Sequence, residues 1–532
     1  PDFINFRKKD RADELDDIVA TTGSAMLGLT LGCARCHDHK FDPIPTADYY
    51  RLTAFFTSTK RIDRPLDPAQ GEDYERRLAD FEKRLKQADK ERKKVSGELR
   101  DRVRLARIAA LPISESDKAL LRASDEHPSA AQKELLHRFQ DQLDFNEKEL
   151  RASLSDADRA KLEAVKKAED ALEATKPSDI PRMLVIEEDG QPQKSYLLPR
   201  GDVEHPGPEV TPAFLSVLSP GKAPTPSSRL TRVDLARWLT DDVHGAGALL
   251  ARVAINHLWQ HHFGRGLVDT PGDFGVRGDP PTNPALLDWL ASELIRNGWR
   301  SKVVQKEILL SAVYRQDVAF DAKCAEIDPA NDLWWRREPE RLEAEALRDS
   351  ILSVSGQLNA KLFGPAVKPP IAPEAITVTN PSKHYDEWPR DVVDGPEMWR
   401  RSIYIFAKRA NLFPFLQAFD APNAVGSCTR RNPTTVAPQA LALMNDSFVR
   451  ARAKDFATRL TKIGSGEARI ASAFLLAFGR KPAELEVAKS LSFLADQTRE
   501  YRSNANLPEP DKAALADFCQ ALIASNEFSS ID

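Results

Sequence analysis

The sequence predicts a mainly α-helical, multi-domain protein, and three observations support this fold class. The chain has 532 residues, which suits two to four domains at roughly 150 residues each. Apolar residues recur at helical spacing over most of its length, as in the segments 229–239, 249–263 and 284–297. Strand-like patterns are confined to a short segment near residues 183–198.

The composition describes a globular protein without a strong excess of charge. Apolar residues make up 41% of the chain and charged residues 29%, and the net charge is −4. This balance gives no reason to expect nucleic acid or an anionic membrane as a partner. No run of about 20 apolar residues is present, so no transmembrane helix is expected. Because the sequence begins at Pro1 without an initiator Met, we expect it to be the C-terminal part of a longer precursor that supplies a signal peptide.

Four segments of different character define the expected domains. Residues 1–71 are helical around a cysteine motif. Residues 72–178 are rich in charged residues, Ala and Leu, which predicts an antiparallel helical hairpin or short coiled coil that serves as a spacer or docking arm. Residues 179–228 predict a small β-hairpin over an Asp-Gly turn, between 183–190 and 194–198, and then a Pro-rich linker. Residues 229–532 predict an α-helical domain.

The cysteine motif is the stretch Cys33-Ala-Arg-Cys36-His37, which has the C-x-x-C-H spacing of covalent haem c attachment. Two thiols about one helical turn apart can add to the two vinyl groups of the porphyrin. The histidine that follows directly can then bind the iron as the proximal ligand. The motif therefore predicts that Cys33, Cys36 and His37 hold one haem c.

Two alternatives for the motif remain open. Cys33, Cys36, His37 and His39 could supply a zinc site of mixed sulfur and nitrogen ligands, although a structural zinc usually uses a second ligand pair farther along the chain. The two cysteines could instead form a disulfide or a dithiol redox pair.

A second axial ligand of the iron would have to come from elsewhere in the chain. The candidates are His39, His261, His262, Met26 and Met444. His39 is too close in sequence to His37 to reach the opposite face of a haem. The cluster of His257, His261 and His262 is polar and precedes Gly264, so we prefer it as a distal or active-site group. Hydrogen bonding between helices explains the same histidines equally well.

An enzyme with a pocket in residues 229–532 is a second hypothesis. One dense polar set comprises Asn256, His261, His262, Arg265, Asp273 and Arg277, and another comprises Glu343, Glu345, Arg348 and Asp349. Such sets can bind an anionic or carbohydrate substrate through arginine contacts, or they can form an ion-pair network between helices. We take His261, His262 and Arg265 as the candidate catalytic residues. No Ser-His-Asp order, P-loop or Rossmann fingerprint is present.

Several long strings in the chain resemble one protein family. The string LGLTLGCARCHDHKFDPI, from Leu27 to Ile44, resembles the end of the planctomycete cytochrome-associated DUF1549 (PSCyt2) domain. Six further strings resemble the companion DUF1553 (PSD1) domain, at 237–240, 251–268, 273–278, 311–316, 341–349 and 434–446. The resemblance covers most of the chain outside 72–178.

This resemblance implies a secreted or periplasmic protein of unknown biochemical activity, and the family often carries an additional cytochrome c-like domain. It supports haem c at Cys33, Cys36 and His37. We therefore expect an extracytoplasmic haem protein that transfers electrons. This transfer would be linked to the oxidation of an unknown substrate, and carbohydrates are among the candidates. Its partner would be a redox protein or a cytochrome domain. The alternative is a non-catalytic surface or scaffold protein whose cysteines form a structural metal or disulfide site.

Overall fold

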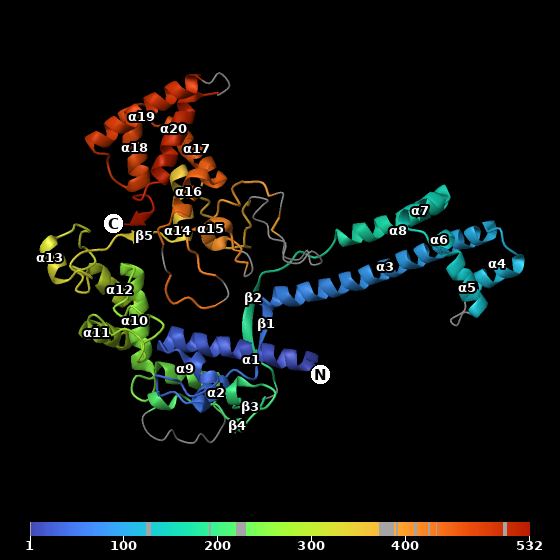
Figure 1. Ribbon diagram of the computed structural model, residues 1–532, viewed down its shortest axis with the longest axis horizontal. Helices are drawn as coiled ribbons and strands as arrows, with labels where there is room; N and C mark the ends of the chain where they lie inside the picture. The colour runs from blue at the N-terminus through green and yellow to red at the C-terminus, as the bar shows by residue number, and fades with distance from the viewer. Residues whose placement is uncertain are drawn as a thin grey trace. The chain divides into compact units, whose positions relative to one another are not determined.

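The computed structural model of the chain is shown in Figure 1. It describes residues 2–123, 129–190, 193–219, 230–371, 388–389, 392–408, 412–423, 426–431, 434–503 and 508–531, with side chains from Lys9 onward. These residues form two compact units. Unit 1 comprises Pro1–Ser58 and Asp189–Asp532, and unit 2 comprises Thr59–Glu188.

The first group of elements in unit 1 packs around one apolar core. Its elements are α1 (Asp2–Thr22), the π-helical turn η1 (Gly23–Leu27), the 3-10 turn η2 (Leu31–Arg35), α2 (Thr46–Thr53), β3 (Ser195–Tyr196), η3 (Pro199–Gly201), β4 (Glu209–Val210), η4 (Ser216–Leu218) and α9 (Arg232–Thr240). Strands β3 and β4 are antiparallel. The core includes Leu31, Tyr49 and Trp238, and the ring of Phe214 stacks on Trp238.

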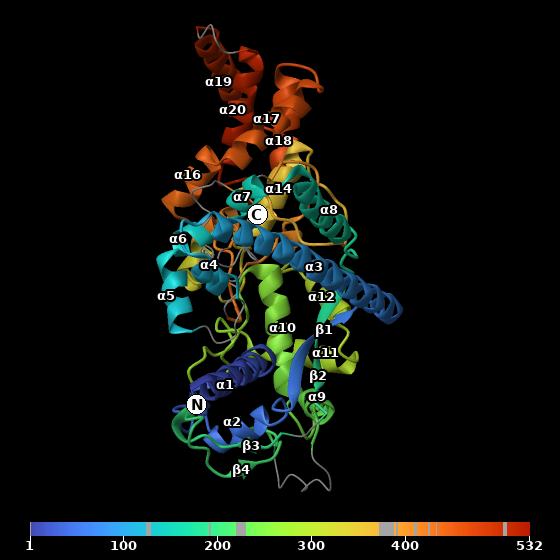
Figure 2. The ribbon, with the colours of Figure 1, turned by 90° about the vertical axis from the view of Figure 1, so that its right-hand side faces the viewer.

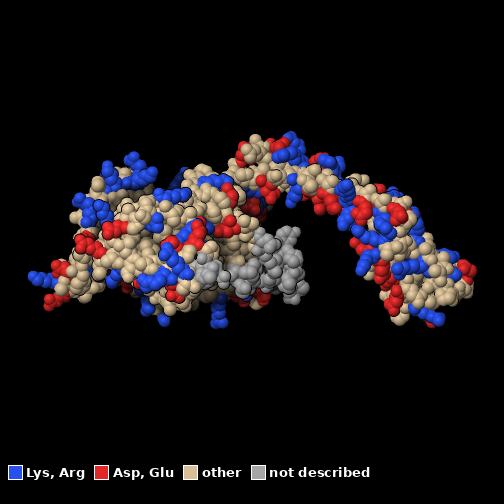
Figure 3. Space-filling view, turned by 90° about the horizontal axis from the view of Figure 1, so that it is seen from above, with Lys and Arg blue, Asp and Glu red and all other residues tan. Residues whose placement is uncertain are grey.

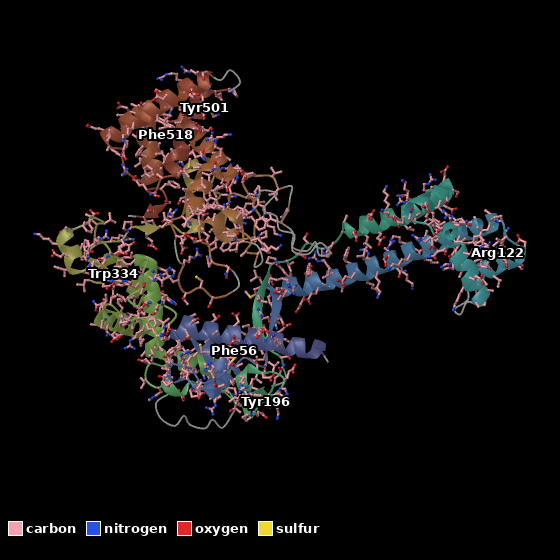
Figure 4. All side chains as sticks on the ribbon, viewed as in Figure 1. Phe56, Arg122, Tyr196, Trp334, Tyr501 and Phe518 are labelled. Carbon is pink, nitrogen blue, oxygen red and sulfur yellow. The ribbon has the colours of Figure 1, made fainter. Side chains whose placement is uncertain are left out.

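The second group in unit 1 is built on α10 (Gly247–Phe263), which stands between the N-terminal and C-terminal groups of helices (Figure 2). Its other helices are α11 (Pro284–Arg296), α12 (Ser301–Leu310) and α13 (Ala322–Ile327). Helix α11 begins with Pro at its first position. The Asn283 side chain caps it by accepting the N–H of Leu286. Trp334, labelled in Figure 4, packs edge-on against Trp259 of α10.

The third group in unit 1 is the C-terminal helical bundle. Its elements are β5 (Glu340–Arg341), α14 (Ala344–Ser355), η7 (Ser402–Tyr404), α15 (Pro414–Ala418), α16 (Ala437–Asn445), α17 (Ser447–Thr461), α18 (Glu467–Phe478), α19 (Glu484–Ser503), α20 (Pro510–Ile523) and β6 (Ser530–Ile531). Its core includes Ile351, Phe456 and Ile523. Strands β5 and β6 are antiparallel, so the last described residues of the chain pair with the segment that enters α14.

Unit 2 is a helical arm that begins and ends with paired strands. Its elements are β1 (Thr59–Pro65), α3 (Pro68–Ala110), α4 (Glu115–Arg122), α5 (Ala130–Arg138), α6 (Gln140–Leu143), α7 (Glu147–Ser153), α8 (Asp156–Glu173) and β2 (Arg182–Glu188). The ion pairs Arg92–Glu169 and Arg102–Asp158 set α3 and α8 antiparallel. On the face of the arm seen in Figure 3, Lys and Arg are interspersed with Asp and Glu.

The mainly α-helical fold class is confirmed, but the strand pairing differs from the prediction. The segment 183–190 does not pair with 194–198. Instead β2 pairs antiparallel with β1, from Thr59 opposite Glu188 to Pro65 opposite Arg182, and β3 pairs with β4. The Asp-Gly turn was a local signal, whereas β1 lies far from β2 in sequence. Much of the expected Pro-rich linker, residues 220–229, lies outside the described residues.

Two predicted helices are also shorter than the periodicity suggested. The segment 438–460 is divided into α16 and α17 at Asp446, whose carboxylate accepts the N–H of Phe448 at 2.7 Å and caps α17. The segment 340–354 begins as strand β5, and only then enters α14. Across the described residues, no helix is long and apolar enough to cross a membrane.

Candidate functional site

The cysteine motif lies on turn η2 and just beyond it, and contacts of Ala34 and Arg35 hold its backbone. Ala34 is fully buried, while Cys33 and Cys36 are exposed and free. Arg35, between them, forms ion pairs with Asp13 at 2.6 Å and with Asp16 at 3.1 Å. The turn therefore presents two accessible thiols on a held backbone.

Tyr50 of α2 holds the same turn from the other side. Its hydroxyl donates to the carbonyl oxygens of Arg35 at 2.8 Å and of Leu198 at 3.2 Å. Burial, opposed by Arg35 and supported by Cys36, raises the pKa of Tyr50 to about 12. Tyr50 therefore keeps its proton at neutral pH and remains a donor to the motif.

His37 and His39 have different surroundings although only Asp38 separates them in the sequence. His37 is exposed, and its Nδ1 lies 2.7 Å from the carbonyl oxygen of Asp38. Because a carbonyl oxygen only accepts, Nδ1 carries the proton and Nε2 keeps its lone pair. His37 is thus the residue of the motif whose imidazole can serve as a metal ligand.

His39 is held by hydrogen bonds at both ring nitrogens. Its Nδ1 accepts the backbone N–H of Asp42 at 2.9 Å, and its Nε2 lies 3.3 Å from the hydroxyl of Thr30. Its side chain is only 3% exposed. His39 therefore closes the loop after the motif and has no nitrogen available for a haem iron or a zinc ion.

The loop after the motif is joined to residues far along the chain. Asp42 accepts the backbone N–H of Val276 at 2.8 Å, and Phe274 donates its N–H to the carbonyl of Gly28 at 2.6 Å. The Arg277 guanidinium lies 5.0 Å from the ring centre of Phe41. Residues 273–277 therefore support the motif loop.

The predicted catalytic residues do not all lie together. A cavity of about 660 Å³ lies between the end of α10 and the start of α14. His261 and Arg265 line it, as does His257. His262 is not among its lining residues, because its ring packs edge-on against Tyr314. Burial lowers the pKa of His262, with His261 and Arg337 adding to the effect.

The remaining members of the two predicted polar sets are mainly structural. Asn256 is fully buried and exchanges two hydrogen bonds with the backbone of Val268, at 2.9 and 2.8 Å. Arg348 is buried and donates to the carbonyls of Arg400 and Met398, and burial lowers its pKa to about 10. Asp349 accepts from Ser402. Of the second set, Glu343 lines the cavity.

Sequence reasoning missed several other cavity residues. They are Glu340, Arg341, Asp420, Cys428, Arg430, Arg431 and Gln439. Arg431 pairs with Glu345 at 2.6 Å and with Glu343 at 3.3 Å. The strings 341–349 and 434–446 were the available signal, but nothing in them showed which side chains converge on one space.

Glu340 has the most distinctive position in the cavity. Its carboxyl packs over Gly264, the residue that ends α10, so closely that a Cβ there would be 3.2 Å from its Cδ. Helix carbonyls at that end disfavour a negative charge. Burial raises the pKa of Glu340 and Glu343 adds to this, whereas Arg337 and His261 oppose it. Glu340 is therefore suited to carry a proton.

In the described part of the chain, neither the cysteine motif nor the cavity contains a group of side chains arranged to bind a metal ion. Within the described ranges, no three His, Cys, Asp or Glu side chains are arranged to hold a metal ion. The four residues of the predicted zinc alternative therefore do not converge in this structure.

Comparison with known proteins identifies two domains. Residues 231–494 match PSD1, described as a protein of unknown function (DUF1553), and residues 4–61 match PSCyt2, described as a protein of unknown function (DUF1549). No curated protein and no solved structure matches the chain significantly. The cysteine motif lies in the PSCyt2 match, and most of the cavity lies in the PSD1 match. The chain therefore carries a PSCyt2 segment and, farther along, a PSD1 domain.

Proposed function

We propose that this protein attaches one haem c through Cys33 and Cys36, with His37 as an axial ligand of the iron, and that it transfers electrons. The observation that carries the proposal is the orientation of His37. Its Nδ1 is bonded to the carbonyl of Asp38 at 2.7 Å, which leaves Nε2 as the ligand nitrogen on an exposed ring. Such a bond fixes the tautomer and raises the basicity of a metal-binding histidine.

The surroundings of the motif suit covalent attachment. Both thiols are exposed, and the backbone between them is held by Arg35 and by the hydroxyl of Tyr50. A held turn loses little conformational freedom when its two sulfur atoms are fixed to one macrocycle. When bound, the haem would supply one-electron redox chemistry, and Cys33, Cys36 and His37 would hold it.

Localisation and partner follow from the same proposal. Covalent haem attachment takes place outside the cytoplasm, so we propose a periplasmic or extracellular protein. Its partner is then a redox protein or a cytochrome domain that exchanges electrons with the exposed motif. The rival function is a non-catalytic surface or scaffold protein in which Cys33 and Cys36 form a disulfide or bind a metal.

The test is to express the chain in a bacterial periplasm together with cytochrome c maturation factors. The proposal expects an intact mass increased by one haem and a haemochrome spectrum that survives denaturation. Cys33→Ser with Cys36→Ser should abolish both signals. Cys324→Ser, a change at a half-buried cysteine outside the motif, should leave both unchanged.

Two results would contradict the proposal. An unmodified mass without a Soret band would exclude covalent haem, and zinc analysis and thiol titration would then separate a metal site from a disulfide. A mass increase that persists in the double serine variant would place the haem elsewhere.

A further inference from the structure

The cavity beside α10 contains buried polar atoms that the protein itself does not satisfy. Four lining side chains of the described chain have a buried atom without a hydrogen-bond partner in the protein. These atoms are Nε2 of His257, Oε1 of Gln260, Nε of Arg265 and Oε1 of Gln439. Gln439 is only 1% exposed. Buried polar groups are nearly always paired, so four unpaired atoms within the wall of one cavity point to a ligand that pairs with them once these side chains turn toward it.

The charges around the cavity are already balanced by the protein. Arg265 pairs with Asp332 at 2.9 Å, Arg430 with Asp269 at 2.6 Å, and Arg431 with Glu345 at 2.6 Å. The guanidinium of Arg341 donates to Thr435 at 2.9 Å. Burial opposes ionisation of Asp420, but hydrogen bonds from Thr434 and Gln439, with a smaller contribution from Arg341, lower its pKa. Each of these four guanidinium groups has a partner within the protein, so none of them requires an anionic ligand as its counter-ion.

The unsatisfied atoms call for a ligand that both donates and accepts. The two Gln oxygens only accept, and the Arg265 nitrogen only donates. The His257 ring already donates to the carbonyl of Pro271, which leaves its unpaired Nε2 as an acceptor. Hydroxyl groups donate and accept at the same atom, and several on one rigid ring can meet groups on different walls. Glu340, when protonated, adds a further donor.

We propose that this cavity binds a neutral polyhydroxylated ligand of the size of one or two sugar rings, with Gln260 and Gln439 accepting its hydroxyl hydrogens. The volume of about 660 Å³ lies within the usual range for small-molecule sites. The proposal is independent of the haem at the cysteine motif, because it depends only on residues of the cavity.

The experiment is saturation-transfer NMR on the full chain with defined probes. The neutral probes are cellobiose, xylobiose, mannobiose, lactose and myo-inositol, and the charged probes are glucuronate and glucose 6-sulfate. We expect saturation transfer to at least one neutral probe. Gln260→Met, which removes the acceptor at nearly constant volume, should weaken that binding at least fivefold.

A matched variant and a second readout separate a binding role from a structural one. Gln305→Met changes another half-buried glutamine, on α12 and outside the cavity, and should leave binding unchanged. Because Gln260→Met removes an unpaired buried acceptor, its melting temperature should equal or exceed that of the wild type. If Gln260→Met does not fold, Ala346→Trp, at an exposed helical position on the cavity wall, should block the probe instead.

Three results would overturn the proposal. No saturation transfer to any neutral probe would mean that the cavity holds water only. Binding of the charged probes alone would assign the cavity to anions. Equal loss of binding in Gln260→Met and Gln305→Met would place the bound sugar elsewhere.

Discussion

The backbone N–H of Val276 donates a hydrogen bond to Oδ1 of Asp42 at 2.8 Å, which joins the loop after the cysteine motif to the segment after α10. The two residues belong to the two different family domains of the chain. Asp42 is only 7% exposed, and a Cβ on Gly275 would lie 2.6 Å from its carboxylate oxygens. The contact is therefore close and specific, and it couples the motif loop to the helical domain.

Replacing Asp42 by Ala should destabilise unit 1. The change removes the side chain that accepts the partly buried N–H of Val276, and losing a hydrogen bond to a charged group costs about 1.5–3 kcal/mol. Urea unfolding followed by circular dichroism measures the loss. Asp17→Ala, at an exposed position on α1, serves as the control and should change the free energy of unfolding little. Equal stability of the two variants would contradict a structural role for Asp42.

The two histidines of the motif region should respond in opposite ways. His39→Ala removes the acceptor of the Asp42 N–H and should cost about 1–3 kcal/mol of stability even without haem. His37→Ala removes an exposed ring and should leave the melting temperature of the haem-free protein nearly unchanged. In the haem-loaded protein, His37→Ala should alter the Soret band while His39→Ala preserves its position. The reverse pattern would assign the ligand to His39.

Gly264→Ala should be more destabilising than Gly298→Ala. Both glycines have positive φ, +73° and +64°, so either Ala is strained by roughly 1–2 kcal/mol. Only at Gly264 would the new Cβ also press on the carboxyl of Glu340, since nothing lies within 4 Å of the corresponding position at Gly298. The difference between the two melting temperatures isolates this contact. A larger loss for Gly298→Ala would show that Glu340 does not pack over Gly264.

Because the pKa of Glu340 is raised in the folded protein, the free energy of unfolding should depend on pH. Burial favours its protonated form in the folded protein, so the folded state keeps this proton to a higher pH than the unfolded chain does. Its stabilising contribution is complete below the unfolded pKa of about 4.3 and is lost as pH rises through the folded value.

Glu340→Gln removes this loss. The variant should therefore gain stability over the wild type as the pH is raised from about 4 to 7. Melting temperatures across this range, with the exposed Glu326→Gln as a control, measure the effect. A gain that is constant with pH would contradict the assignment to the Glu340 proton.

The arm should be removable without unfolding unit 1. Asp189 donates its N–H to the carbonyl of Ser58 at 2.7 Å, so the chain leaves and re-enters unit 1 at one point. Replacing residues 59–188 by Gly-Ser-Gly should therefore preserve a cooperative thermal transition and strong helical circular dichroism. Residues 59–188 alone should also be helical. Aggregation of the shortened chain would show that unit 1 depends on the arm.

Helical periodicity carried most of the fold prediction, and its failures have physical causes. The pattern around Leu99 and Val103 correctly indicated a long amphipathic helix, because every turn repeats the signal locally. The pairing of β2 was missed because β1, with the sequence Thr-Lys-Arg-Ile-Asp-Arg-Pro, is too charged to be recognised as a strand. The pairing of β1 with β2 is set by the helical arm between the two strands rather than by a short turn.

The site was predictable only in part for a similar reason. The spacing of Cys33, Cys36 and His37 is a local property of the sequence. The support of the motif is not, because Val276 contributes a backbone N–H, which no residue type reveals. The cavity likewise brings Gln260 and Gln439 together from segments far apart in the chain, and each looks like an ordinary helical glutamine in its own segment.

The pairing of Thr59 with Glu188 has a kinetic consequence. While the arm is unfolded, Ser58 and Asp189 end a long flexible loop, whose closure carries an entropic cost. The hairpin of α3 and α8 is rich in contacts that are local compared with those of unit 1, so it should form early. Once β1 and β2 pair, the loop is already closed, and the N-terminal helices meet β3 and β4 as if they were neighbours in sequence. We therefore expect the arm to fold before unit 1 does.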